Sequence, residues 1–167
     1  MNGPKGGGGR GPAADDVRIL AADPRDRAAR DCLRQYYDEL ARRFRQGFDV
    51  SLSRDPEAGA MLPPHGVFLV AWSAGRPVGC AGLKGSGQGE AEVKRVWVAP
   101  EARGRGLARR LMTEIEARAT DLSIHRLMLD TNSALPEAVA LYRNTGWTEI
   151  DRFNDDPYPD RFFEKRL

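Results

Sequence analysis

The chain is poor in the residues that build metal sites, disulfide frameworks and membrane spans. Its 167 residues include two cysteines and two histidines. Cys32 and Cys80 lie in apolar segments without the spacing of a metal or redox centre, which predicts reduced core thiols and no bound metal. His65 and His125 are equally isolated. No apolar run approaches the roughly 20 residues that cross a membrane, and no charged-then-apolar leader opens the chain, so we expect a cytoplasmic protein without membrane contact.

Neither sign of charge is in large excess. The formal net charge is +2, and basic residues alternate with acidic ones. A nucleic-acid-binding domain usually carries a larger excess or a dense basic stripe, so we expect no nucleic-acid partner. The exception is a cluster of Arg103, Arg105, Arg109 and Arg110. An RNA or DNA contact at this cluster is the weaker alternative, and salt-dependent binding would reveal it.

Length and composition predict a single domain with a short tail. Residues 1–14 consist largely of Gly, Pro and Ala; such a segment cannot bury a core and predicts a flexible tail. Residues 15–167 suit one domain with a sizeable core.

Hydrophobic periodicity predicts an α/β fold. Apolar residues recur at helical spacing over residues 26–44, which predicts one helix or a broken pair. Residues 48–64 read as a long loop, and residues 67–72 and 78–83 as a hairpin. Further strands are expected at 17–20, 92–98, 126–130, 147–153 and 162–167. Helices are expected after residue 106 and from Pro136 to about Asn144, and Gly146 suits the end of the second of these helices. Together these elements predict a mixed sheet of about seven strands with helices on both faces.

The most informative segment runs from the strand at residues 93–98 through a glycine loop into a helix. This order aims backbone N–H groups and a helix N-terminus at one point, which suits a phosphate. Gly104 and Gly106 allow close approach of a ligand, and Arg103 and Arg105 add positive charge. The segment lacks the Gly-Lys-Ser/Thr of nucleotide hydrolases and the third glycine of the dinucleotide fingerprint. It predicts a diphosphate-binding cradle of another kind.

This cradle resembles the R-x-x-G-x-A signature of the GNAT superfamily of acetyl-CoA-dependent N-acetyltransferases, with Arg103, Gly106 and Ala108 in the signature positions. A Val-Ala-Pro segment at residues 98–100 and a Leu-Tyr-Arg-Asn-Thr-Gly-Trp segment at residues 141–147 follow the same pattern. The resemblance covers most of the chain after about Val17. It implies the GNAT fold, in which two central strands of a mixed, mostly antiparallel sheet splay apart to admit the coenzyme.

The resemblance also implies acetyl-CoA as cosubstrate and a set of residues that bind it. The strand at residues 92–98 should bind the pantetheine arm through its backbone, while the side chain of Trp97 is expected in the core. Asn132 is a candidate for the pantetheine amides, with a helix cap as its alternative. The full set is Val96, Trp97, Val98, Arg103, Gly104, Arg105, Gly106, Leu107, Ala108, Asn132 and Tyr142.

Two residues are candidates for the acid–base chemistry of acetyl transfer. Glu92 stands where family members that use a glutamate base carry it, and would act through water; a strand-end carboxylate paired with Lys94 or Arg126 is the alternative. Tyr142 matches the family tyrosine that protonates the departing thiolate. The alternative is that Tyr142 is a half-buried structural tyrosine. No nucleophile–histidine–acid set is evident, so direct transfer is preferred over an acyl-enzyme on Cys80.

The acceptor is expected to be the primary amine of a small or amino-acid-like molecule. In the family its pocket comes from the first helix, the following loop and the last strand pair, which here supply acidic and aromatic groups suited to a cation: Tyr36, Tyr37, Glu39, Phe48 and Tyr158. Acetylation of a protein lysine or N-terminus remains open, as does a non-catalytic acyl-CoA sensor or scaffold. The oligomeric state is also open, with a homodimer as one option.

Overall fold

The computed structural model describes residues 16–52 and 59–167. The predicted tail at residues 1–14 and part of the predicted loop, residues 53–58, lie outside the described residues. None of the helices in the described ranges is long and apolar enough to cross a membrane.

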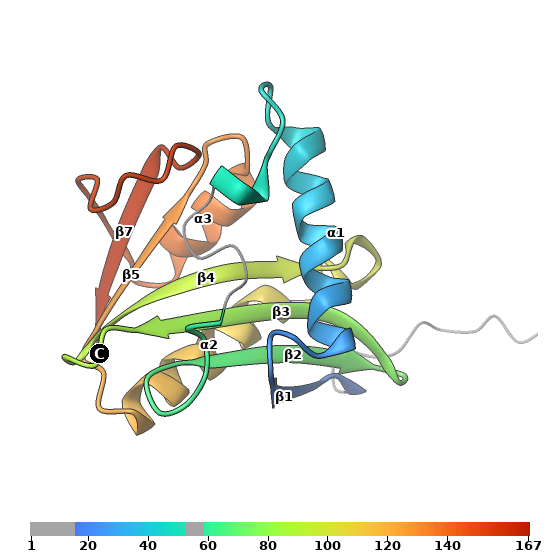
Figure 1. Cartoon of the computed structure of the whole chain (residues 1–167), viewed down its shortest axis with the longest axis horizontal. Coiled ribbons are helices and arrows are strands. Elements are labelled where there is room, and N and C mark those ends of the chain that lie inside the picture. The colour runs from blue at the N-terminus through green and yellow to red at the C-terminus, as the bar shows by residue number, and fades with distance from the viewer. Residues whose placement is uncertain (1–15, 53–58) are drawn as a thin grey trace, which may run out of the picture.

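A seven-stranded sheet forms the centre of the molecule, as the sequence predicted (Figure 1). The strand order is β1-β2-β3-β4-β5-β7-β6. Neighbouring strands are antiparallel except β4 and β5, which are parallel. The strands are β1 (Arg18–Ala22), β2 (Val67–Ser73), β3 (Arg76–Gly85), β4 (Glu90–Val98), β5 (Arg126–Thr131), β6 (Thr148–Ile150) and β7 (Arg161–Arg166).

Helices cover both faces of this sheet. Helix α1 (Arg27–Arg43) is a single helix that crosses one face of β2–β4, and α2 (Leu107–Asp121) crosses the opposite face (Figure 1). Helix α3 (Pro136–Asn144) begins with Pro136 in its first turn, and Gly146 has a φ of 87° just beyond its end. Apolar residues three to four positions apart face the sheet from α1 and α2, which explains why both are helices: Ala29, Cys32, Leu33 and Leu40, and Leu107, Leu111, Met112, Ile115 and Ala119.

The parallel strands β4 and β5 pair over only part of their length. Their register runs from Glu90 opposite Arg126 to Val93 opposite Leu129. Beyond that point the two strands diverge, and β4 continues to Val98 (Figure 1). A bulge accompanies the divergence: Lys94 pairs with Gly82 and Trp97 with Cys80, so two β4 residues face one on β3. A bulge bends its strand and redirects the neighbouring side chains.

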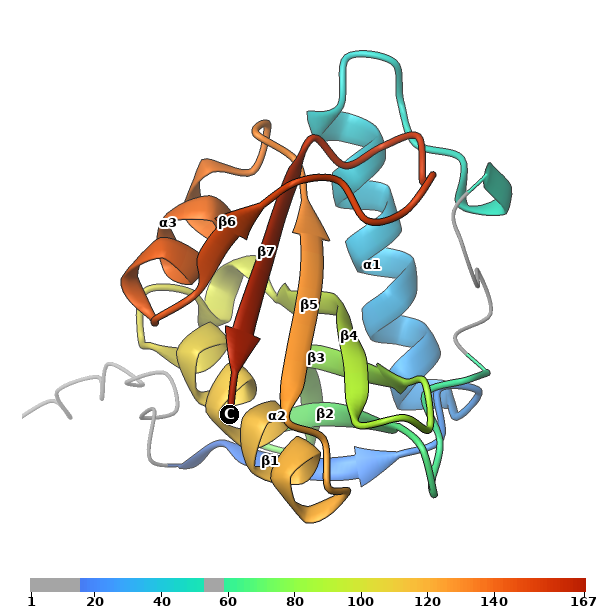
Figure 2. The same cartoon turned by 90° about the vertical axis from the view of Figure 1, so that its left-hand side faces the viewer.

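Strand β6 is shorter than the predicted strand at residues 147–153. It ends at Ile150, and residues 151–160 form a loop that reaches toward the C-terminal end of α1 (Figure 2). Arg152 holds this loop together, since its guanidinium donates hydrogen bonds to the carbonyl oxygens of Asp156 (3.0 Å) and Pro159 (2.8 Å) and stacks on Phe162. Arg152 thus ties two carbonyl groups of the loop to the start of β7, in a segment where the predicted strand has already ended.

Candidate active site

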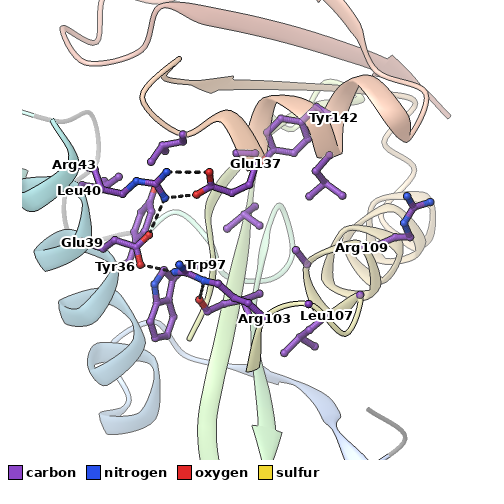
Figure 3. A pocket seen from close by; sticks show the side chains of 18 residues that line it. Tyr36, Glu39, Leu40, Arg43, Trp97, Arg103, Leu107, Arg109, Glu137 and Tyr142 are labelled. Carbon is purple, nitrogen blue, oxygen red and sulfur yellow. Dashed lines mark hydrogen bonds and ion pairs between the residues drawn. The ribbon is translucent and has the colours of Figure 1, made fainter. Parts of the chain in front are cut away.

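A cavity of about 340 Å³ opens where α1, the end of β4, the start of α2 and α3 meet; we call it the first cavity (Figure 3). Most of the residues predicted to bind the coenzyme line it, although they come from three separate elements. They are Val96, Trp97, Val98, Arg103, Gly104, Gly106, Leu107, Ala108 and Tyr142. Arg105 lies outside this lining, while Arg109 belongs to it.

The glycine loop borders the first cavity in the geometry that the sequence predicted. Gly104 and Gly106 have φ values of 79° and 75°, a left-handed conformation that side chains disfavour. A Cβ atom at either glycine would meet nothing within 4 Å, so the loop has open space before it. Gly106 caps α2 without a side-chain hydrogen bond. The first N–H groups of α2 therefore have no intrahelical partner and are available to an anion.

Ion pairs connect three elements across this cavity (Figure 3). Arg43 of α1 pairs with Glu137 of α3 and with Glu39 on its own helix. Arg103 pairs with Glu39 and donates from Nε to the Val98 carbonyl oxygen (2.9 Å). Burial acts to raise the pKa of Glu39, but hydrogen bonds from Arg103 and Arg43 outweigh it and hold the pKa below its usual value. Glu39 is therefore an ionised partner of the cradle arginine, and it lines the first cavity but not the second.

A second cavity, of about 80 Å³, adjoins the first. The two share part of their lining, including Tyr36, Val96 and Tyr142. The second cavity also contains the predicted acceptor residues Phe48 and Tyr158. Four ionisable side chains complete one side of it: Lys94, Arg95, Asp130 and Asp156.

Aromatic rings form the outer wall of the second cavity. Phe48 packs against Tyr158 with ring centroids 4.6 Å apart, and Phe44 stacks on Tyr158 at 5.9 Å. The Tyr158 hydroxyl accepts a hydrogen bond from the Asp49 backbone N–H (2.7 Å), which joins the β6–β7 loop to the segment after α1. Tyr37 lies behind this wall, stacked on Phe48 at 5.5 Å. The structure thus brings Tyr36, Phe48 and Tyr158 to the cavity and leaves Tyr37 as a packing neighbour.

Tyr142 lies at the junction of the two cavities. Its side chain is 5% exposed, and its ring packs against Trp147 (5.9 Å) and Phe163 (5.8 Å). Burial, together with the nearby charge of Asp130, raises the pKa of its phenol above the ordinary value. A phenol with a raised pKa stays protonated at neutral pH and can donate a proton there.

The predicted base Glu92 lies outside the linings of both cavities. Its side chain is 22% exposed, and its Oε2 is 3.7 Å from Lys94 Nζ. Arg126 forms its ion pairs with Glu90 and Glu164 instead. The strand-end pairing with Lys94 is thus present, and any part that Glu92 plays in proton transfer requires an intervening water.

Asp130 is a carboxylate at the second cavity that sequence reasoning missed. It is near the end of β5 and accepts a hydrogen bond from Asn154 Nδ2 (2.6 Å). Burial raises the pKa of its carboxyl, against the opposing effects of Asn154 and Lys94. A raised pKa is common at catalytic carboxylates. The available signal was an acidic residue that closes an otherwise apolar strand, Leu127 to Leu129.

Asn132 lines the second cavity and not the first. Both ends of its amide are engaged: Nδ2 donates to the Tyr158 carbonyl oxygen (2.6 Å), and Oδ1 accepts from the Ala134 N–H (2.8 Å). The alternative of a helix cap is wrong, because α3 is capped by Leu135 without a side-chain hydrogen bond. Asn132 instead supports the turn between β5 and α3.

Known proteins resemble both the sequence and the fold. The model of the acetyltransferase (GNAT) family matches residues 33–147. An IAA acetyltransferase of Azospirillum brasilense is 32% identical over 148 residues, which cover 86% of this chain and 95% of that protein. The crystal structure of an acyl-CoA N-acyltransferase from Klebsiella pneumoniae superposes with a TM-score of 0.73 at 26% identity and covers 90% of this chain and 97% of that one. A GNAT family acetyltransferase from Elizabethkingia anophelis, solved with acetyl-CoA bound, has a TM-score of 0.64 at 16% identity and covers 92% and 99% of the two chains.

Proposed function

Because the chain belongs to the GNAT family of acetyltransferases, we propose that it moves an acetyl group from acetyl-CoA directly to the primary amine of a small acceptor. The observation that carries this proposal is that Tyr142 lines both cavities. One cavity begins at a helix N-terminus with open glycines, and the other ends among ionisable side chains. A donor and an acceptor that entered from these two sides would meet at the phenol.

The residues of the first cavity fit acetyl-CoA. The unpaired N–H groups at the start of α2, with Arg109 nearby, suit a diphosphate. Beyond Val93 the edge of β4 is released from β5, so its backbone near Val96 and Val98 is available to the amides of a pantetheine arm. The arm would then lead the thioester toward Tyr142.

The chemistry requires removal of a proton from the amine and donation of one to the thiolate. An alkyl amine is mostly protonated at neutral pH, so a base assists the attack. Asp130 borders the second cavity and is our candidate for direct contact with the amine. Glu92 remains a candidate that acts through water. Tyr142, protonated at neutral pH, is the candidate acid for the departing sulfur.

The shape of the second cavity supports a small acceptor rather than a protein lysine. Its volume is about 80 Å³, and the β6–β7 loop covers it through the contact of Tyr158 with Asp49.

The test is incubation of the purified protein with acetyl-CoA and a panel of amines, with free thiol release followed over time. We expect release that depends on both the protein and one class of amine, with mass spectrometry detecting the acetylated product. Tight acetyl-CoA binding without release for any amine or for lysine peptides would instead support the sensor or scaffold function.

A further inference from the structure

Lys94 is a buried cation with few partners. Its side chain is 6% exposed, yet it lines the second cavity. Among the described residues its ion-pair partner is the Glu92 carboxylate, and the 3.7 Å between Nζ and Oε2 exceeds a hydrogen bond. Its charge also acts on the carboxyl of Asp130. An ammonium has three N–H donors, and burial without hydrogen bonds is unfavourable. The position therefore suits an anion supplied by a ligand.

A carboxylate lies beside this ammonium in the same cavity. Lys94 and Asp130 directly follow Val93 and Leu129, the last paired residues of the parallel strands β4 and β5. The Asp130 carboxylate is oriented by Asn154, and Asp156 accepts a hydrogen bond from the Tyr158 N–H (3.1 Å). The second cavity thus holds Lys94 and Asp130 as a positive and a negative group on adjacent strands, in a lining that also includes Arg95 and Asp156.

Part of the remaining wall is aromatic. Phe44, Phe48 and Tyr158 pack in mutual contact on the side of the cavity formed by the end of α1 and the β6–β7 loop. Rings in such a cluster suit an apolar or aromatic side chain. The two charges and the ring wall together describe a ligand with an amine, an anion and an apolar group.

We propose that the acceptor is a free α-amino acid with an aromatic or other apolar side chain, whose carboxylate binds Lys94 while its amine faces Asp130. The proposal rests on the acetyltransferase function proposed above. In an α-amino acid one carbon separates the amine from the carboxylate, which matches two binding groups on adjacent strands. A simple amine or a peptide N-terminus has no carboxylate at this place and offers Lys94 no hydrogen-bond acceptor.

The test compares three probes of the same ring and amine: L-phenylalanine, L-phenylalaninamide and phenethylamine. Each is titrated by calorimetry into protein saturated with coenzyme A, and each is assayed as an acceptor with acetyl-CoA. A hydrogen bond between charged groups is worth roughly 10- to 100-fold in affinity. We expect L-phenylalanine to exceed both analogues, which keep the amine but lack the carboxylate, by about this factor in affinity and in kcat/KM.

Variants assign the preference to Lys94. Lys94→Met retains the apolar stem and removes the ammonium, and it should reduce the preference for L-phenylalanine to near unity. Lys94→Arg should retain part of it. Lys84→Met, a matched change on the neighbouring strand β3 outside both linings, should leave the preference intact.

The outcomes separate this proposal from the proposed function. Equal affinity and equal kcat/KM for the three probes in the wild-type protein would overturn the amino-acid proposal while leaving the acetyltransferase in place, and this comparison holds even where Lys94→Met is unstable. A preference that persists in a folded Lys94→Met variant would overturn the role of Lys94. Lys94-dependent binding of L-phenylalanine without acetylation of any probe would support the site and contradict the acetyltransferase.

Discussion

At the level of single residues, Tyr142 combines a ring fixed by packing with a phenol that faces two cavities. Tyr142→Phe keeps the contacts with Trp147 and Phe163 and removes only the hydroxyl. Because thiolates leave readily, the loss of an acid should matter without abolishing the reaction. We expect kcat to fall by about 10²-fold, the low end for general acid–base catalysis, with little change in the acetyl-CoA dissociation constant or in the melting temperature. Loss of binding and stability at an unchanged kcat would make Tyr142 a structural residue only.

Two carboxylates compete for the role of base, and pH distinguishes them. Asp130 borders the second cavity, whereas Glu92 contacts Lys94. We expect Asp130→Asn to lower kcat/KM at neutral pH by roughly 10²–10⁴-fold, with partial recovery at higher pH, where more of the amine is already neutral. Glu92→Gln should show a smaller loss of the same form. The measurement is the pH dependence of kcat/KM for both variants, and a wild-type profile for Asp130→Asn would exclude it as the base.

Stability measurements give a control for the Asp130 variant. Burial raises the folded-state pKa of Asp130 above its ordinary value. A raised pKa means that the protonated group contributes stability at low pH, and that this contribution is lost as pH rises through the folded pKa. Asp130→Asn should therefore gain stability relative to the wild type as pH rises from about 4 toward neutrality. A difference in melting temperature between the variant and the wild type that stays constant over this pH range would show that the folded-state pKa of Asp130 is not raised.

Among the elements, the cradle was predictable because it is local. The strand, the turn through Pro100, the glycines and the helix with Leu107 and Leu111 are contiguous in the sequence, and the fold reproduces their order. The second cavity was only partly predictable. Its ionisable groups meet only once β4 and β5 adopt their register and the bulge after Lys94 forms. Nothing in the local sequence reports that register, so Lys94 and Asp130 were not recognised as neighbours.

The cradle itself supports a prediction with a matched control. Gly106→Asp places a negative side chain where the diphosphate is proposed to bind, and close like charges repel strongly in a partly dry site. The position also has a φ of 75° that a side chain disfavours. Gly75, in the β2–β3 turn, has a φ of 74° and equally open surroundings. Gly75→Asp therefore reproduces the backbone strain alone.

Calorimetric titration with acetyl-CoA compares the two glycine variants. We expect Gly106→Asp to weaken binding by at least about tenfold, since one charge-assisted contact is worth roughly 1.5–3 kcal/mol. Gly75→Asp should bind like the wild type at a similarly lowered melting temperature. Unchanged binding in Gly106→Asp would overturn the assignment of the diphosphate to this loop.

Over the whole molecule, the first cavity lies where two parts of the sheet separate. Strands β1–β4 carry α1 and α2 on their faces, while β5, β7 and β6 run beside α3 (Figure 1). The backbone pairing between these parts covers the register from Glu90 to Val93. The ion pair of Arg43 with Glu137 joins α1 to α3 across the gap. Its partners are partly exposed, and such pairs usually contribute less than about 1 kcal/mol.

A ligand in this gap should therefore stabilise the whole molecule and not one element alone. A ligand at 100 times its dissociation constant stabilises the folded state by about 2.7 kcal/mol. For a domain of this size, 1 kcal/mol corresponds to roughly 2–4 °C in melting temperature. We expect acetyl-CoA at that concentration to raise the melting temperature of the wild-type protein by about 5–10 °C in a single cooperative transition. Differential scanning calorimetry measures both the shift and the number of transitions. Gly106→Asp should show a much smaller shift at the same acetyl-CoA concentration. Two separate transitions, with only one of them shifted, would mean that acetyl-CoA binds one part of the sheet rather than the junction between the two parts.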